Sequence, residues 1–315
     1  MPRADKQSGE MARTIQTEIC GIPLESPTML ASGVLGISFE LFPRIIGSGC
    51  GAIVSKSIGL EPREGYGNPT MTGVESGYLN AIGLANPGAQ DFLREIEQYN
   101  GPRFPLILSI FADSPENFSN LASIFDNVDS VLGLELNLSC PHVKEVGSEI
   151  GSNPETASEV VRQVKHATRK PVFAKMPASL PNVGIWSRAV ESAGADAIVA
   201  INTIRAMKID VEARKPILSN KIGGLSGPAI KPVGVRCVYE AYESVDIPIV
   251  GVGGVSTWED AVEYFLAGAR CVQLGSAMGN SNFLSTFASL NLGLDQYRKV
   301  HGYSSYEELI GAAHD

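Results

Sequence analysis

Short apolar runs recur along the whole chain, and stretches with the period of a helix separate them. Eight runs of four to six residues stand out, at 28–31, 52–56, 106–110, 134–137, 172–175, 197–202, 247–251 and 271–275. They do not alternate strictly between apolar and polar positions, a pattern typical of strands buried on both faces in a parallel sheet. The runs therefore predict eight parallel strands.

The segments between the runs predict helices. Residues 159–165 have helical spacing, and residues 258–266 do too, after a Ser-Thr cap at 256–257. The alternation continues to the C-terminus without a long linker, which favours an α/β chain folded as a single (β/α)₈ TIM barrel over residues 15–315. The two widest gaps, 57–105 and 203–246, are rich in Gly and Pro and predict extended loops over the C-terminal face. Residues 1–14 are polar and predict a flexible leader.

Composition narrows the functional classes. The chain has 315 residues with 33 Gly and 19 Pro, 44% apolar and 19% charged, which excludes a disordered polymer and a coiled coil. A net charge of -9 argues against a nucleic-acid partner. The longest uncharged stretch, 271–294, contains Gln, Ser, Asn and Gly, so no membrane span is expected. Five cysteines without a CxxC pair fit a reducing compartment. We expect a cytoplasmic protein with a small-molecule partner.

Polar residues close several of the predicted strands. Lys56, Asn137, Lys175 and Asn202 each follow an apolar run. A charge or an amide there is costly unless it meets a partner or a ligand. Because the carboxyl ends of barrel strands form the active-site face, these four residues predict a common site.

Glycines close the last two predicted strands. The chain reads Gly-Val-Gly-Gly at 251–254 and Gly-Ser-Ala at 275–277. Backbone amides that approach a ligand closely can hold a phosphate, and TIM barrels commonly place a phosphate site after strands seven and eight. The pattern predicts a phosphorylated cofactor.

A cysteine follows the fourth predicted strand. Cys140 lies in Asn-Leu-Ser-Cys-Pro-His at 137–142, before a loop that contains Gly147 and Gly151. A thiol in such a loop can act as a base or nucleophile. The other cysteines, at 20, 50, 237 and 271, are interpreted as small buried hydrophobes. His142 has no metal-ligand spacing with the other histidines, and no metal site is predicted.

Several segments together resemble the dihydroorotate dehydrogenases. They are Ser-Lys-Ser at 55–57, the run from Leu79 to Gly88, Asn-Leu-Ser-Cys-Pro at 137–141, Ile-Asn-Thr at 201–203, and Gly-Gly-Leu-Ser-Gly-Pro-Ala-Ile-Lys-Pro at 223–232. The resemblance covers nearly the whole barrel from about residue 20. The run at 223–232 and the preceding 207–210 look most like the class 1B branch. In the membrane-bound class 2 branch the base is a serine, whereas this chain has Cys140.

The resemblance implies FMN as the cofactor and oxidation of (S)-dihydroorotate to orotate in pyrimidine (UMP) biosynthesis. Cys140 would remove a proton from ring carbon 5 while carbon 6 gives hydride to flavin N5, with Lys56 as the second catalytic residue. Cofactor-binding positions are Ser32, Lys56, Ser57, Ser109, Asn137, Lys175, Ile201, Gly227, Gly253, Gly254, Gly275 and Ser276. Substrate-binding positions are Lys56, Asn80, Ala81, Ile82, Gly83, Leu84, Asn137, Asn202 and Thr203.

The chain departs from the family pattern at some positions, and two alternatives remain open. His142 replaces the usual Asn, and Ser109 stands where an Asn commonly touches the flavin. Ser-Cys-Pro-His also occurs in dihydropyrimidine dehydrogenase, which reduces uracil or thymine with a later loop cysteine, where this chain has Ile150. A tRNA-dihydrouridine synthase is a similar flavoenzyme, but it needs a basic surface. Both are less favoured than dihydroorotate oxidation.

Electrons must leave the chain for an external acceptor, because it has neither an iron–sulfur cysteine cluster nor a GxGxxG segment. Class 1B relatives pass electrons to a second subunit with FAD and a [2Fe–2S] cluster, which reduces NAD. The resemblance therefore implies such a partner and a homodimer, while fumarate, quinone or another acceptor remain alternatives.

Overall fold

Eight parallel strands close into a barrel in the computed structural model, which describes residues 15–36, 38–139, 151–279 and 282–314. The strands are β3 (Thr28–Leu30), β4 (Ala52–Val54), β7 (Leu106–Ile110), β8 (Val131–Asn137), β9 (Val172–Lys175), β10 (Ala197–Ala200), β15 (Ile249–Val252) and β16 (Ala269–Leu274). They neighbour one another in chain order, and β16 pairs with β3 to close the circle. Each predicted run overlaps one of these strands, so the predicted barrel is confirmed.

A helix follows each barrel strand. The helices are α2 (Phe42–Ile46), α3 (Ala89–Gln98), α4 (Pro115–Phe125), α5 (Pro154–Ala167), α6 (Val183–Ser192), α7 (Lys231–Tyr242), α8 (Trp258–Leu266) and α9 (Phe283–Val300). Short 3₁₀ turns occur at η1 (Pro228–Ile230), η2 (Ser276–Gly279) and η3 (Tyr306–Leu309). The predicted cap of α8 is present as a capping box between Thr257 and Asp260.

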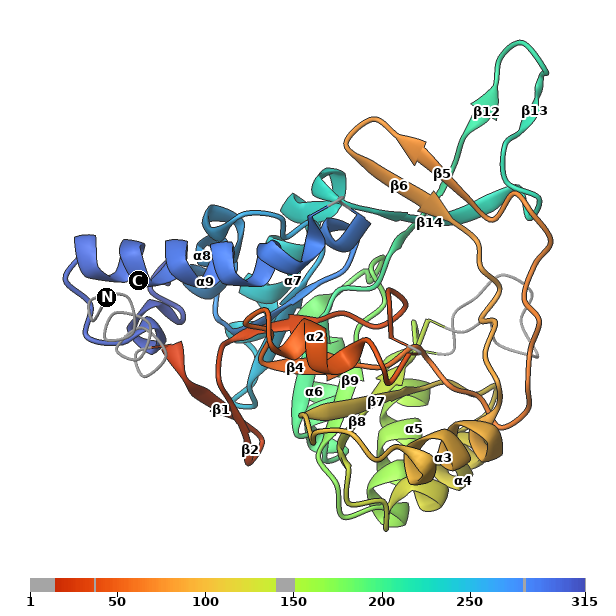
Figure 1. Ribbon diagram of the computed structural model, residues 1–315, viewed down its shortest axis with the longest axis horizontal. Helices are drawn as coiled ribbons and strands as arrows, with labels where there is room; N and C mark the ends of the chain where they lie inside the picture. Colours follow the sequence, from red (N-terminus) through yellow and green to blue (C-terminus); the bar gives the residue numbers. More distant parts are fainter. Residues whose placement is uncertain (1–14, 37, 140–150, 280–281, 315) are drawn as a thin grey trace.

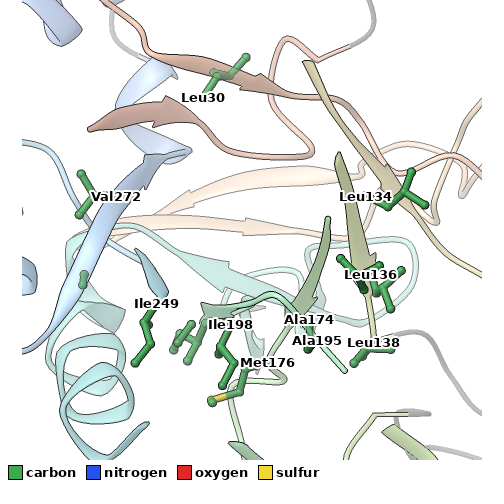
Figure 2. Packing of buried hydrophobic residues seen from close by; sticks show 14 of the residues in the cluster. Leu30, Leu134, Leu136, Leu138, Ala174, Met176, Ala195, Ile198, Ile249 and Val272 are labelled. Atoms are coloured by element: carbon green, nitrogen blue, oxygen red, sulfur yellow. The ribbon is translucent and has the colours of Figure 1, made fainter. Parts of the chain in front are cut away.

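The strand residues alternate between two apolar layers. One layer lies between the strands and the helices, and Figure 2 shows some of its members, among them Leu134 and Leu136 of β8. The other layer fills the barrel interior with residues such as Val54, Phe173 and Val199. The hairpin of β1 (Thr17–Ile19) and β2 (Ile22–Leu24) contributes side chains to this inner layer. Burial on both faces explains why the runs lack strict alternation.

The two wide gaps form a sheet of their own outside the barrel. The strands β5 (Met71–Val74) and β6 (Gly77–Asn80) come from the first gap, while β11 (Ile204–Met207) and β14 (Ile222–Ser226) come from the second. They pair antiparallel in the order β11-β14-β6-β5. A further hairpin, β12 (Ile209–Asp210) with β13 (Lys215–Pro216), projects beyond this sheet (Figure 1). The sequence predicted extended loops here but not their pairing.

Candidate active site at the strand ends

A chain of hydrogen bonds joins polar residues at the ends of three barrel strands. The Asn137 amide nitrogen Nδ2 donates to Ser57 Oγ at 3.1 Å, and Asn202 Nδ2 donates to Asn137 Oδ1 at 3.0 Å. The Ser57 hydroxyl also lies 2.9 Å from the hydroxyl of buried Ser109. Asn137 ends β8, while Ser57 and Asn202 follow β4 and β10. The structure thus brings together four predicted site residues from separate strands.

Lys175 lies beside this chain at the end of β9. It is the register partner of Asn137 on the neighbouring strand β8. The ammonium Nζ donates to Ser32 Oγ at 3.0 Å and lies 3.1 Å from Glu135 Oε1. Glu135 Oε2 in turn accepts a hydrogen bond from Gln273 Nε2 at 2.8 Å. The predicted pair Ser32 and Lys175 is therefore in contact, and both belong to a larger buried cluster.

Lys56 follows β4 and is half-buried. Its backbone N–H donates to Gly36 O at 2.8 Å, which fixes the start of its side chain. Within the described parts of the chain, its ammonium has no hydrogen bond or ion pair. Burial away from water lowers the pKa of Lys56 below that of an ordinary lysine. A half-buried ammonium without a partner among the described residues is suited to bind an anionic ligand.

The segment 80–84 reaches the same end of the barrel through the outer sheet. Asn80 ends β6 and donates from Nδ2 to Gly224 O on β14 at 3.2 Å. A methyl group at Gly224 would collide with the hydroxyl of Thr203, so Asn80, Gly224 and Thr203 lie together. Thr203 N–H donates to Asn202 Oδ1 at 2.8 Å. The predicted substrate residues of both gaps thus connect to Asn137 through Asn202.

Asn86 forms hydrogen bonds that hold the loop of the predicted substrate residues Ala81, Ile82, Gly83 and Leu84. Asn86 Oδ1 accepts from the N–H groups of Gly59 and Gly88 at 3.1 and 2.9 Å. Its Nδ2 donates to Leu84 O at 2.8 Å. Asn86 has no predicted role, although an asparagine directly before Pro87 is a signal for a side chain that organises a turn.

Two glycine-rich strand ends present backbone N–H groups side by side. Gly253 and Gly254 follow β15, and Gly275 and Ser276 follow β16, the neighbouring strand. In the described part of the chain, no hydrogen bond joins their four N–H groups to another protein atom. Gly254 has φ +74°, and a Cβ there would lie 2.8 Å from Gly227 O. Backbone N–H groups without a partner among the described residues suit an oxyanion such as a phosphate.

Ile201 is buried directly after β10. Its N–H donates to Val252 O at 2.9 Å, and its peptide bond with Ala200 is cis. The bond to Val252 links the end of β10 to the end of β15, and so links the asparagine chain to the glycine-rich strand ends.

The proposed base Cys140 and its neighbours His142 and Ile150 lie outside the described residues, as does the predicted leader 1–14. The residues on either side of the segment 140–150 are placed. Gly151 N–H donates to Leu138 O at 2.8 Å, and Trp186 Nε1 donates to Gly151 O at 2.7 Å. The described residues Leu138 and Gly151, which flank this segment, therefore lie together at the carboxyl end of β8, near Asn137.

Glu135 and Gln273 are site residues that sequence reasoning missed. Both are buried, and both lie within strands rather than after them. A carboxylate between Leu134 and Leu136 was the available signal, because such a group needs a buried partner. The other cysteines follow the prediction in part: Cys50, Cys237 and Cys271 are buried, whereas Cys20 is partly exposed in the turn between β1 and β2.

Neither a metal site nor a membrane-spanning helix is found in the portion of the chain that the structure describes. No group of three or more His, Cys, Asp or Glu residues in this portion is arranged to hold a metal ion. Among the helices of the same portion, none is long and apolar enough to cross a membrane.

Comparison with known proteins gives one consistent result. Residues 14–289 match the sequence profile described as "Dihydroorotate dehydrogenase". The chain is 46% identical over 299 residues to "Dihydroorotate dehydrogenase B (NAD(+)), catalytic subunit" of Thermococcus kodakarensis, covering 95% of this chain and 98% of that protein. Proteins of the same name from Pyrococcus furiosus and Methanocella arvoryzae are 47% and 44% identical over 300 and 294 residues. They cover 95% and 93% of this chain and 99% and 96% of their own length.

Proposed function

The chain belongs to the dihydroorotate dehydrogenase family, and we propose that it oxidises (S)-dihydroorotate to orotate with FMN as its bound oxidant. The observation that carries this proposal is the hydrogen-bonded chain of Ser57, Asn137 and Asn202 at the strand ends, flanked by the cations Lys56 and Lys175. Amide groups offer both a donor and an acceptor, which matches the alternating N–H and C=O groups of a dihydropyrimidine ring.

The residues present fit FMN at both of its ends. The unpaired N–H groups of Gly253, Gly254, Gly275 and Ser276 suit the phosphate. Lys175 is fixed at the end of β9, where its ammonium would stabilise the negative charge that the flavin acquires on reduction. Ser32, Ser57, Ser109, Ile201 and Gly227 are the further cofactor positions, and Ser109 would act through its hydrogen bond to Ser57.

The substrate would bind between Lys56 and the two asparagines. Lys56 would offer the substrate carboxylate an ammonium that has no ion pair among the described residues. The segment Asn80–Leu84 and Thr203 would cover the ring from the side of the outer sheet. Cys140 is proposed as the base that takes the proton from ring carbon 5, while bound FMN supplies the acceptor for the hydride of carbon 6.

Electron transfer to a second subunit completes the proposal. The relatives named above are catalytic subunits of NAD(+)-linked enzymes. We infer an electron-transfer partner with FAD and a [2Fe–2S] cluster for this chain, and a homodimeric barrel subunit in the cytoplasm.

An anaerobic reduction assay tests the proposed activity. Purified protein loaded with FMN is mixed with dihydroorotate, and we expect the flavin absorbance to bleach while orotate forms in equal amount. A separate sample of the oxidised, FMN-loaded protein is mixed with dihydrouracil, which lacks the carboxylate. Bleaching by dihydrouracil at the same rate, or no bleaching by dihydroorotate, would refute the proposal. Reoxidation by NAD, fumarate, quinone and a dye in separate mixtures identifies the acceptor, and rapid reoxidation by NAD alone would remove the need for a partner.

A further inference from the structure

A buried charged cluster crosses the barrel interior beneath the strand ends. Glu135, Gln273 and Lys175 are 0%, 2% and 4% exposed. Around and below them the interior is filled by apolar residues such as Val54 and Val199. A carboxylate and an ammonium are costly to bury, and their pairing has to offset much of that cost. Neither Glu135 nor Gln273 has a part in the activity proposed above.

The geometry fixes the Glu135 carboxylate from two sides of the barrel. Oε1 lies 3.1 Å from Lys175 Nζ, and Oε2 accepts from Gln273 Nε2 at 2.8 Å. Glu135 and Lys175 stand on the neighbouring strands β8 and β9, whereas Gln273 stands on β16, three strands away from β9 in the closed order. Each carboxylate oxygen therefore has its own partner, and rotation of the carboxylate would break two interactions at once.

The ammonium of Lys175 is held by the same arrangement. Its second partner, Ser32 Oγ, follows β3, which is the neighbour of β16. The two contacts fix its height relative to the strand ends, and the adjacent carboxylate offsets part of its charge. Lys175 thus meets any ligand at the strand ends as one member of an ion pair rather than as an isolated cation.

We propose that Glu135 is a positioning residue that sets both the place and the effective charge of Lys175, and so holds the reduction potential of the bound flavin below the value that an unpaired lysine would give. This inference rests on the proposed use of FMN. It predicts effects of opposite sign for the two members of the pair. Removing the carboxylate leaves more positive charge beside the reduced flavin and raises the potential, whereas removing the ammonium lowers it.

The test is the reduction potential of FMN bound to the Glu135→Gln and Lys175→Met proteins, measured anaerobically against reference dyes at the same pH as for the wild type. For Glu135→Gln we expect the equilibrium constant for reduction to rise by about tenfold or more, which is about 30 mV for a two-electron couple. Lys175→Met is expected to shift it in the opposite direction. Glu135→Asp keeps the carboxylate but moves it away from the Lys175 ammonium, because the side chain is shorter. We expect it to raise the reduction potential less than Glu135→Gln does.

A matched control separates positioning from structural support. Asp295 is a buried carboxylate on α9 that pairs with Arg298 at 2.8 Å, outside the barrel. Asp295→Asn is expected to lower the free energy of unfolding without moving the flavin potential. An unchanged potential in Glu135→Gln, or a fall like that of Lys175→Met, overturns the inference. If Glu135→Gln does not fold, the sign of the shift in Glu135→Asp decides.

Failure of the inference can be told apart from failure of the proposed function. Wild-type protein that binds no FMN, or whose FMN is not reduced by dihydroorotate, refutes the proposed function. Wild-type protein that passes both tests while Glu135→Gln keeps the wild-type potential refutes the role of Glu135 alone.

Discussion

Asn202 donates its side-chain amide to the carboxamide oxygen of Asn137 at 3.0 Å, and this bond fixes which end of each amide faces the strand ends. Asn137 Oδ1 also accepts from Ser139 N–H at 3.3 Å, while its Nδ2 donates to Ser57. Asn202 Oδ1 accepts from Thr203 N–H. Two amides oriented by their own neighbours need little reorganisation when a ring with fixed donors and acceptors binds.

Breaking this bond should impair the reaction more than the fold. We expect Asn202→Ala to lower kcat/KM for dihydroorotate by about 10- to 100-fold, because one amide contact is lost and Asn137 loses one of the hydrogen bonds that orient it. Steady-state kinetics with a dye acceptor measure the change. Asn220→Ala is the matched control, since Asn220 is exposed and its side chain donates to Ile222 O within its own turn. Equal losses in both variants would contradict a role for Asn202.

Local sequence was enough to predict the barrel but not the outer sheet. The barrel strands lie in predominantly apolar runs, and the start of α8 carries its own cap in Thr257. The outer sheet depends on pairs such as Asn80 with Gly224, which lie far apart along the chain. Its strands are short and mixed in polarity, so no local pattern distinguishes them from a loop.

The candidate site also combines residues that local sequence predicts with residues that depend on distant partners. Lys56, Asn137, Lys175 and Asn202 could be predicted because each interrupts an apolar run at its end. Glu135 and Gln273 lie inside their runs, and they hydrogen-bond each other across the barrel from β8 and β16. Their position in the sequence does not reveal this contact. The spacing of residues along one strand says nothing about which side chain lies across the barrel.

Substitution of Gly254 tests the proposed phosphate-binding site. Its φ of +74° is costly for other residues, and a Cβ would press on Gly227 O and on the side chain of Lys231. We expect Gly254→Ala to weaken FMN binding by tenfold or more and to lower the free energy of unfolding by about 1–3 kcal/mol. Fluorescence titration with FMN and urea unfolding of the apoprotein measure the two effects. Gly67→Ala, where a Cβ meets nothing within 4 Å, should change neither. Wild-type FMN affinity in Gly254→Ala would remove it from the phosphate site.

Lys56 should give substrate binding a distinctive pH dependence. Its ammonium is charged below its pKa, and burial lowers that pKa. Attraction of the substrate carboxylate is therefore full at low pH and is lost as pH rises through the lowered value, earlier than for an ordinary lysine. We expect the Kd for orotate to increase over this range. Lys56→Arg keeps its charge there, and its Kd should stay flat with pH. A rise in Lys56→Arg that matches the wild type would assign the dependence to another group.

Cys140 should be required for turnover because it is the proposed base, and a thiol accepts the substrate proton only as thiolate. An ordinary thiol titrates near pH 8.5, so we expect wild-type kcat to rise toward alkaline pH. Cys140→Ala should lose about 100-fold or more of the activity at unchanged FMN content. Cys140→Ser should retain a trace that needs higher pH.

The matched control for Cys140 is Cys237, which lies on α7 and whose buried thiol has its pKa raised by burial to about 11. Such a thiol carries no negative charge in the assay range, so Cys237→Ala should keep the wild-type pH profile even if the protein becomes less stable. Turnover per bound FMN is the quantity to compare, because it removes any difference in cofactor content. Near-wild-type turnover in both Cys140 variants would show that another group takes the proton, and the pH profile of Cys140→Ala would then give the pKa of that group.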